Sequence, residues 1–255
     1  MLSYRKLAMR VLGRPLHTGG IDSPRPASQR AAAFILTAAM LTTLAAPAFA
    51  DIWHIEDGDI TVKAGETGND VTQKGTTTYG DTDTIITNSD KNTASSHTVT
   101  IEANDKDDKV EVTLKDVNID TSSRNKAAVS VTGSGNTTIK LDGDNALKSD
   151  SSRSGIYGSG SLTITGGEND SLTAQGGSGA NGIYSSGSLT ISGGTVTANG
   201  GDGDNGIYSS GDVTISGGST VTAKGGDGGS FGGGSGISSF NRVAISGSTV
   251  TCLLY

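Results

Sequence analysis

A three-residue motif, glycine followed by isoleucine and most often tyrosine, recurs in the second half of this chain. It occupies residues 155–157, 182–184, 206–208 and 236–238, at spacings of 27, 24 and 30 residues. Two further short segments of alternating apolar and polar residues follow each copy, the first at 162–164, 189–191, 213–215 and 243–245, the second at 172–174, 196–198, 221–223 and 250–252. Short alternations separated by glycine-, serine- and aspartate-rich clusters indicate β-strands joined by turns. A repeat of this length with three strands predicts one rung of a parallel β-helix.

The same order of strands extends toward the N-terminus with less glycine. Residues 128–131, 138–141 and 146–148 fill the three positions one unit earlier, and 110–114 and 117–119 fill two positions of the unit before that. Residues 97–101 and 60–62 are expected to be edge strands of the first rungs. We therefore predict an all-β fold: a right-handed parallel β-helix (β-solenoid) with three short strands per rung and about six to seven rungs.

The composition agrees with a thin, repetitive core. Only 33% of the residues are hydrophobic and 4% are aromatic, whereas ordinary domains are roughly 45–50% apolar. In a stack of rungs, each aliphatic side chain packs on the same position of the next rung, about 4.8 Å away, so small side chains suffice. We expect Ile164, Ile191 and Ile215 to form one such inward column.

The first 50 residues have the features of a secretory signal peptide. A basic region precedes an apolar run at 31–44, and Ala48 and Ala50 occupy the −3 and −1 positions of a cleavage site. The alternative is a membrane anchor, but the run is shorter than the ~20 residues that span a bilayer. We predict a signal peptide at 1–50, an N-terminal cap with the first rungs at 51–100 and the glycine-rich β-helix at 101–255, in a secreted or cell-surface protein.

The repeat pattern stops in the middle of a rung at residues 251–255, which leads us to expect a truncated product. Cys252 is the one cysteine of the chain, so no internal disulfide is expected. We expect a monomer whose stability comes from backbone pairing and stacking.

The charge of the predicted mature chain limits its partners. The first 50 residues hold six basic residues and one acidic residue, so residues 51–255 retain 13 basic and 25 acidic residues, a net charge of −12. Because binding to phosphates requires a cationic face, a nucleic-acid partner is disfavoured. Neutral glycans and divalent cations such as calcium remain open.

Several segments resemble a known group of proteins. Residues 114–120 and 137–147, together with the repeated Ser-Leu-Thr-Ile-Ser-Gly-Gly-Thr-Val-Thr-Ala units, resemble the bacterial secreted carbohydrate-binding domain-containing β-helix proteins, and glycine-rich surface proteins of gut bacteria share the pattern. The resemblance covers residues 51–255 and rests on strand and turn residues. It implies a right-handed parallel β-helix, similar to that of calcium-using pectate lyases, and binding of polysaccharide.

Three tyrosines occupy the same position in consecutive rungs: Tyr157, Tyr184 and Tyr208. If they point outward, they form an aromatic ladder, and flat aromatic faces suit the apolar faces of sugar rings. The alternative is a ladder that stacks only on itself and stabilises the rungs. The three tyrosines are the candidate carbohydrate-binding residues.

Four acidic residues fall in one turn position of two neighbouring rungs: Asp142, Asp144, Glu168 and Asp170. Oxygen ligands in such a position are suited to a hard cation, so they form a candidate calcium site, with a solvated acidic turn as the alternative. Residues 176–184 and 200–208 also fit a calcium-binding nonapeptide pattern with asparagine in place of aspartate. These two copies are not tandem, whereas that calcium site needs ligands from two successive nonapeptide turns, so stacked turns explain them better.

Catalysis has little support, because no nucleophile with a matching base can be named from the spacing. A polysaccharide lyase of this fold is an alternative function, for which Asp142, Asp144 and Arg153 are the first residues to test. A second alternative is ice binding by two files of hydroxyls on the third strand of each rung: Ser171, Thr173, Thr195, Thr197, Thr220, Thr222, Thr249 and Thr251. We expect a non-catalytic carbohydrate-binding or adhesin-type protein.

Overall fold

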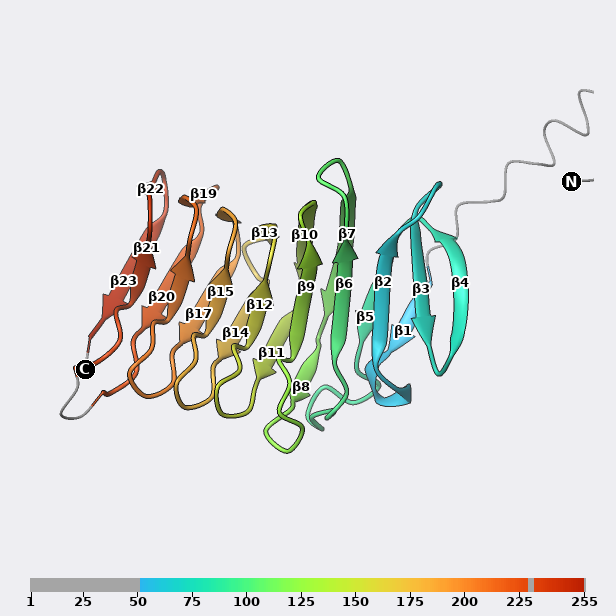
Figure 1. Ribbon diagram of the computed structural model, residues 1–255, viewed down its shortest axis with the longest axis horizontal. Helices are drawn as coiled ribbons and strands as arrows, with labels where there is room; N and C mark the ends of the chain where they lie inside the picture. Colours follow the sequence, from blue (N-terminus) through green and yellow to red (C-terminus); the bar gives the residue numbers. More distant parts are fainter. Residues whose placement is uncertain (1–50, 229–231, 255) are drawn as a thin grey trace, which may run out of the picture. The chain divides into compact units, whose positions relative to one another are not determined.

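The computed structural model describes residues 51–228 and 232–254. The predicted signal peptide and its cleavage site after Ala50 therefore lie outside the described residues. Within the described residues there are 23 β-strands and one short 3-10 helix, η1 (Ile55–Asp57), and no α-helix. The strands form three sheets that run side by side along the stack of rungs (Figure 1).

The first sheet has nine strands. They are, in chain order, β2 (Ile60–Ala64), β3 (Asn69–Gln73), β4 (Thr76–Asp81), β6 (Val99–Ala103), β9 (Val129–Gly133), β12 (Ile156–Gly158), β15 (Ile183–Ser185), β18 (Ile207–Ser209) and β21 (Ile237–Ser239).

The second sheet has eight strands and the third has six. The second contains β1 (Ile52–His54), β5 (Ile85–Thr87), β7 (Lys109–Lys115), β10 (Asn136–Asp142), β13 (Ser161–Thr165), β16 (Leu189–Ser192), β19 (Val213–Ser216) and β22 (Val243–Ile245). The third contains β8 (Asn118–Asp120), β11 (Asp144–Lys148), β14 (Ser171–Gln175), β17 (Thr195–Asn199), β20 (Thr220–Lys224) and β23 (Thr249–Leu253).

Six consecutive rungs, from β6–β8 to β21–β23, each contribute one strand to each sheet. Every strand from β6 to β20 pairs in parallel with the equivalent strand of the next rung, as in β13 with β16 and β16 with β19. The predicted fold, a parallel β-solenoid with three strands per rung, is confirmed.

The core is a set of aliphatic columns inside the rungs. Ile164 pairs with Ile191 and Ile191 with Ile215, and all three side chains are fully buried. This confirms the predicted inward column. The intervening residue Thr190 is half-buried and points outward, so the alternation of apolar and polar residues sets which side of each strand faces the core.

The N-terminal strands differ from the sequence-based expectation. β2 and β6 were expected at the edge, but β6 lies between β2 and β9, and an antiparallel hairpin, β3–β4, extends the first sheet beyond β2. The hairpin turns through Lys74 and Gly75, both with positive φ, as a two-residue turn of type I′ requires. Its strands do not repeat the three-strand unit, so the periodicity gave no sign of them.

Candidate functional site

The three tyrosines form an outward ladder on the first sheet. Tyr157 is flanked by buried residues on β12, so its side chain points away from the core, and it pairs in register with Tyr184, which pairs with Tyr208. The ring centroids of Tyr157 and Tyr184 are 5.1 Å apart with planes 2° from parallel; those of Tyr184 and Tyr208 are 5.4 Å apart and 11° from parallel. The rings therefore point outward and also stack on one another.

This stacking determines which aromatic faces are free. Tyr184 has a ring on each side and can offer only its edge. Tyr157 is covered by Tyr184 on one face, and its other face is directed toward β9, where Ser130 occupies the same position, followed by Thr100 on β6. Because serine and threonine are too small to cover an aromatic ring, that face of Tyr157 stays open, and the residue is 42% exposed.

A groove of about 700 Å³ lies beside the open face of Tyr157. The hydroxyl residues Thr100, Ser130 and Thr132 line it from the outward face of β6 and β9. Its remaining lining comes mainly from turns of three successive rungs, which connect the third sheet to the first: residues 125–127, 152–154 and 179–181. Flat aromatic and hydroxyl groups thus converge in one concavity, which is the combination that small polar ligands require.

The charged residues of the groove are basic. Arg153 and Lys126 line it, and no aspartate or glutamate is among the described residues that do so. Arg153 Nε donates a hydrogen bond to Asn125 Oδ1 at 3.1 Å, which joins the turns of two rungs. Lys126 Nζ lies 3.3 Å from Asp59 Oδ2.

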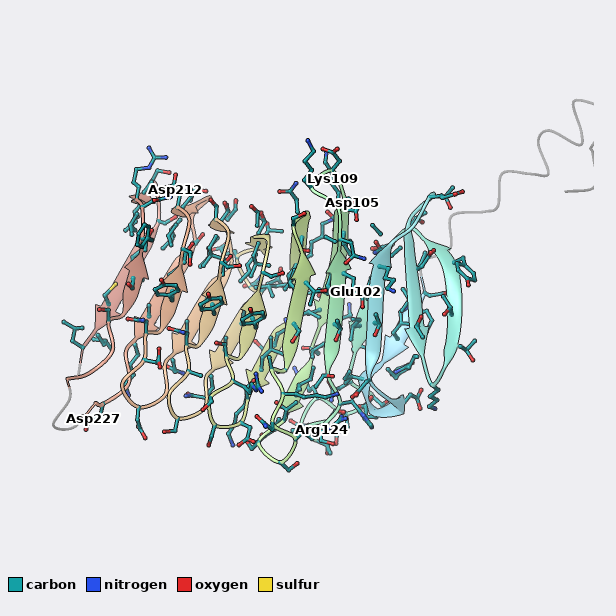
Figure 2. All side chains as sticks on the ribbon, in the orientation of Figure 1. Glu102, Asp105, Lys109, Arg124, Asp212 and Asp227 are labelled. Carbon is teal, nitrogen blue, oxygen red and sulfur yellow. The ribbon has the colours of Figure 1, made fainter. Side chains whose placement is uncertain are left out.

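Asp59 anchors a polar cluster next to the groove. Its carboxylate accepts two hydrogen bonds from Arg124, at 2.6 and 3.0 Å, and one from the Thr98 amide. Partial burial acts to raise the pKa of Asp59, but hydrogen bonds from Arg124 and the Thr98 amide outweigh it, so this pKa lies well below its usual range. Figure 2 shows Arg124 among the turns between the third and first sheets, at the opposite ends of the strands from Asp105, Lys109 and Asp212.

The four acidic residues of the candidate calcium site are not gathered into one cluster. Asp142 Oδ2 is paired with Lys115 at 2.6 Å, and Asp170 accepts hydrogen bonds from the amides of Gly143 and Gly167. Ser171 donates to Asp144, and Glu168 is exposed. Among residues 51–228 and 232–254, no three histidine, cysteine, aspartate or glutamate side chains are placed to hold a metal ion.

The residues proposed for a lyase lie at two different corners of the rung. Asp142 and Asp144 flank the turn between the second and third sheets, and Arg153 lies in the turn between the third and first. Strand β11, five residues long, separates them, which corresponds to about 16 Å of extended chain. The structure therefore does not bring these side chains together.

The two predicted files of hydroxyls are present in register on the third sheet. Ser171 and Thr173 pair with Thr195 and Thr197, and the pairing continues through β20 to β23. Outward threonines also line the second sheet, where Thr163, Thr190 and Thr214 follow one another. Threonine is thus the usual outward residue of this solenoid rather than a mark of one face.

Sequence reasoning found the tyrosines and, for another role, Arg153, but it missed the rest of the groove. Asn125, Lys126 and the hydroxyl residues of β6 and β9 line it without belonging to any motif. One signal was present: within a single strand position, the residue changes from Ser130 to Tyr157 between two rungs. Because serine is much smaller than tyrosine, this change leaves one face of Tyr157 uncovered, and the groove lies beside that face.

Within the part of the chain that the structure describes, no helix has the length and apolar character needed to cross a membrane. Comparisons with protein-family models, with curated proteins and with solved structures found no match to this chain. The resemblance noted in the sequence is therefore supported only as far as the β-solenoid.

Proposed function

We propose that this protein is a non-catalytic carbohydrate-binding protein of adhesin type, secreted or held at the cell surface, which acts as a monomer. The observation that carries the proposal is the open face of Tyr157 at the end of the tyrosine stack. A sugar ring bound there would take the place of the aromatic ring that Ser130 does not provide.

The dimensions and chemistry of the groove suit such a ligand. The stacked tyrosine rings are 5.1 and 5.4 Å apart, close to the spacing of rungs, so one further flat ring fits above the neighbouring rung without displacing backbone. The apolar face of a pyranose would lie on Tyr157. Its hydroxyls would meet those of Thr100, Ser130 and Thr132, which line the same groove.

The test compares two tyrosine variants of the same chemistry. Tyr157→Ala removes the proposed platform. Tyr208→Ala removes the ring at the other end of the stack, whose outer face lies over Ser238 of the next rung and does not line the groove. Binding of the protein to a glycan array and to a panel of polysaccharides is measured for both. We expect Tyr157→Ala to abolish binding and Tyr208→Ala to retain it. Equal binding by Tyr157→Ala and the unmodified protein would refute the proposal.

Ice binding is a second candidate, favoured by the register of the hydroxyl files on the third sheet. Thr197 and Thr222 are aligned partners with identical neighbours two residues before them, Thr195 and Thr220. Flat, regular arrays of threonine hydroxyls and methyls can order water. Thermal hysteresis and ice-recrystallisation assays would show activity that is lost in Thr197→Tyr and Thr222→Tyr, and no effect of the unmodified protein on ice growth would remove this candidate.

A further inference from the structure

We infer that the groove beside Tyr157 selects a sugar that carries a carboxylate, held by Arg153 and Lys126. This inference rests on the proposed carbohydrate binding and adds the chemical class of the sugar. It starts from a contrast in charge: residues 51–255 carry 25 acidic and 13 basic residues, yet the charged residues that line this groove are two cations.

The two cations are available to a ligand to different degrees. Arg153 is exposed and lines the groove. Its Nε donates a hydrogen bond to Asn125, and among the described residues its terminal nitrogens have no hydrogen-bond partner. Lys126 contacts Asp59, but Arg124 already forms a two-pronged ion pair with that carboxylate. Asp59 carries a single negative charge and cannot neutralise both Arg124 and Lys126. The groove therefore keeps a positive charge.

The orientation of the tyrosine rings directs a bound sugar toward these cations. The rings of Tyr157 and Tyr184 are parallel within 2° and stack from rung to rung, so their planes lie across the solenoid axis. A pyranose stacked on Tyr157 would lie in the same orientation, with its ring substituents directed across the first sheet. On one side they would meet the turns that carry Lys126 and Arg153.

A carboxylate attached to the ring would thus point at the guanidinium and ammonium groups. Arginine is well suited to this task, because its planar fork matches the two oxygens of a carboxylate. A neutral hydroxymethyl group at the same position would fit the space but leave the guanidinium of Arg153 without an anionic partner. Because the turns line this side of the groove, we expect the acidic ring to be the end of a glycan chain.

The experiment uses two oligosaccharides that differ only in the last ring, glucuronic acid in one and glucose in the other. Affinities are measured by titration calorimetry for the unmodified protein, for Arg153→Gln, for Arg242→Gln and for Tyr157→Ala. Arg242 is the matched control: its guanidinium pairs with Asp212 at 3.0 Å in turns between the first and second sheets, and the substitution changes the net charge equally.

We expect the glucuronate-ended ligand to bind about fivefold more tightly at low salt, a preference typical of exposed charge pairs that salt reduces. Arg153→Gln is expected to lose most of this preference, so that its affinities for the two ligands become nearly equal, and Arg242→Gln is expected to keep it. Equal affinities of the unmodified protein for both ligands, abolished by Tyr157→Ala, would overturn this inference and leave the proposed function standing. Binding of neither ligand would overturn this inference and leave the proposed function to the glycan array and the polysaccharide panel.

Discussion

Single residues decide, in this fold, between the interior and the surface of a rung. Ile191 and Thr190 are neighbours in the chain, but Ile191 is fully buried between Ile164 and Ile215, and Thr190 points outward. The alternation was readable from the sequence, because the equivalent strands β13, β16 and β19 repeat it. The open face of Tyr157 depends instead on a break in the repeat, because Ser130 occupies the same position on the neighbouring strand.

Ile191→Asp is expected to lower the free energy of unfolding by about 3 kcal/mol or more, because it places a charge without a partner inside the aliphatic column. Thr190→Asp should change it by less than about 1 kcal/mol, since its side chain is outward. Urea denaturation followed by circular dichroism measures both. If the two variants were equally destabilised, the assigned alternation would be wrong.

Asp59 makes stability depend on pH. Its pKa is lowered in the folded protein, against the effect of burial, by its hydrogen bonds to Arg124 and the Thr98 amide. The folded state therefore binds this proton less readily than the unfolded chain, so the contribution is complete above the ordinary aspartate pKa of about 3.9 and is lost as pH falls below it.

We expect the free energy of unfolding of the unmodified protein to fall more steeply in this acid range than that of Asp59→Asn, which has no carboxylate to protonate. Urea titrations at a series of pH values provide the comparison. Parallel pH profiles for the two proteins would show that Asp59 does not contribute through its charge.

At the scale of elements, the sequence predicts the strands that belong to the repeat but not the elements outside it. The strands from β7 onward were located in their correct sheets, because each apolar position recurs after 24 to 30 residues. The hairpin β3–β4 was missed because it is antiparallel and outside the repeat. The wall of the groove was missed for a related reason: turns vary in length and residue type, so periodicity does not indicate where Asn125 and Arg153 meet.

The turns between the third and first sheets stack so closely that some admit only glycine. A Cβ atom on Gly201 would collide with the carbonyl oxygen of Gly177 in the preceding rung, whereas one on Gly203 would meet nothing within 4 Å, although Gly203 has a φ of +78°. Close approach constrains the first position and backbone conformation the second.

Gly201→Ala is therefore expected to cost about 1 to 3 kcal/mol or more, because two rungs must separate to admit the methyl group. Gly203→Ala should cost only the strain of the left-handed conformation, about 1 kcal/mol. Thermal unfolding of the two variants tests the ranking, and a larger loss for Gly203→Ala would contradict the stacking of these turns.

For the molecule as a whole, the repeat makes each rung depend mainly on its two neighbours. Stability in such a stack is close to a sum of rung and interface contributions. Ile183 pairs with Ile207, and Leu189 with Val213, each 24 positions further along the chain. Removal of one full repeat should therefore leave the remaining rungs in register.

Deletion of residues 182–205, which contain β15, β16 and β17, joins Asn181 to Gly206 and places β18 directly on β12. We expect this variant to fold cooperatively with a lower Tm. It should keep ligand binding, because Tyr208 would then stack on Tyr157 and leave the other face of Tyr157 open as before.

The control is deletion of 194–205, which removes only β17 and puts a strand of the first sheet into the third-sheet position. That variant should fail to fold its C-terminal rungs, as measured by circular dichroism and limited proteolysis. If both deletions behaved alike, the rungs would not be independent stacking units, and the solenoid would have to be stabilised by contacts other than those between neighbouring rungs.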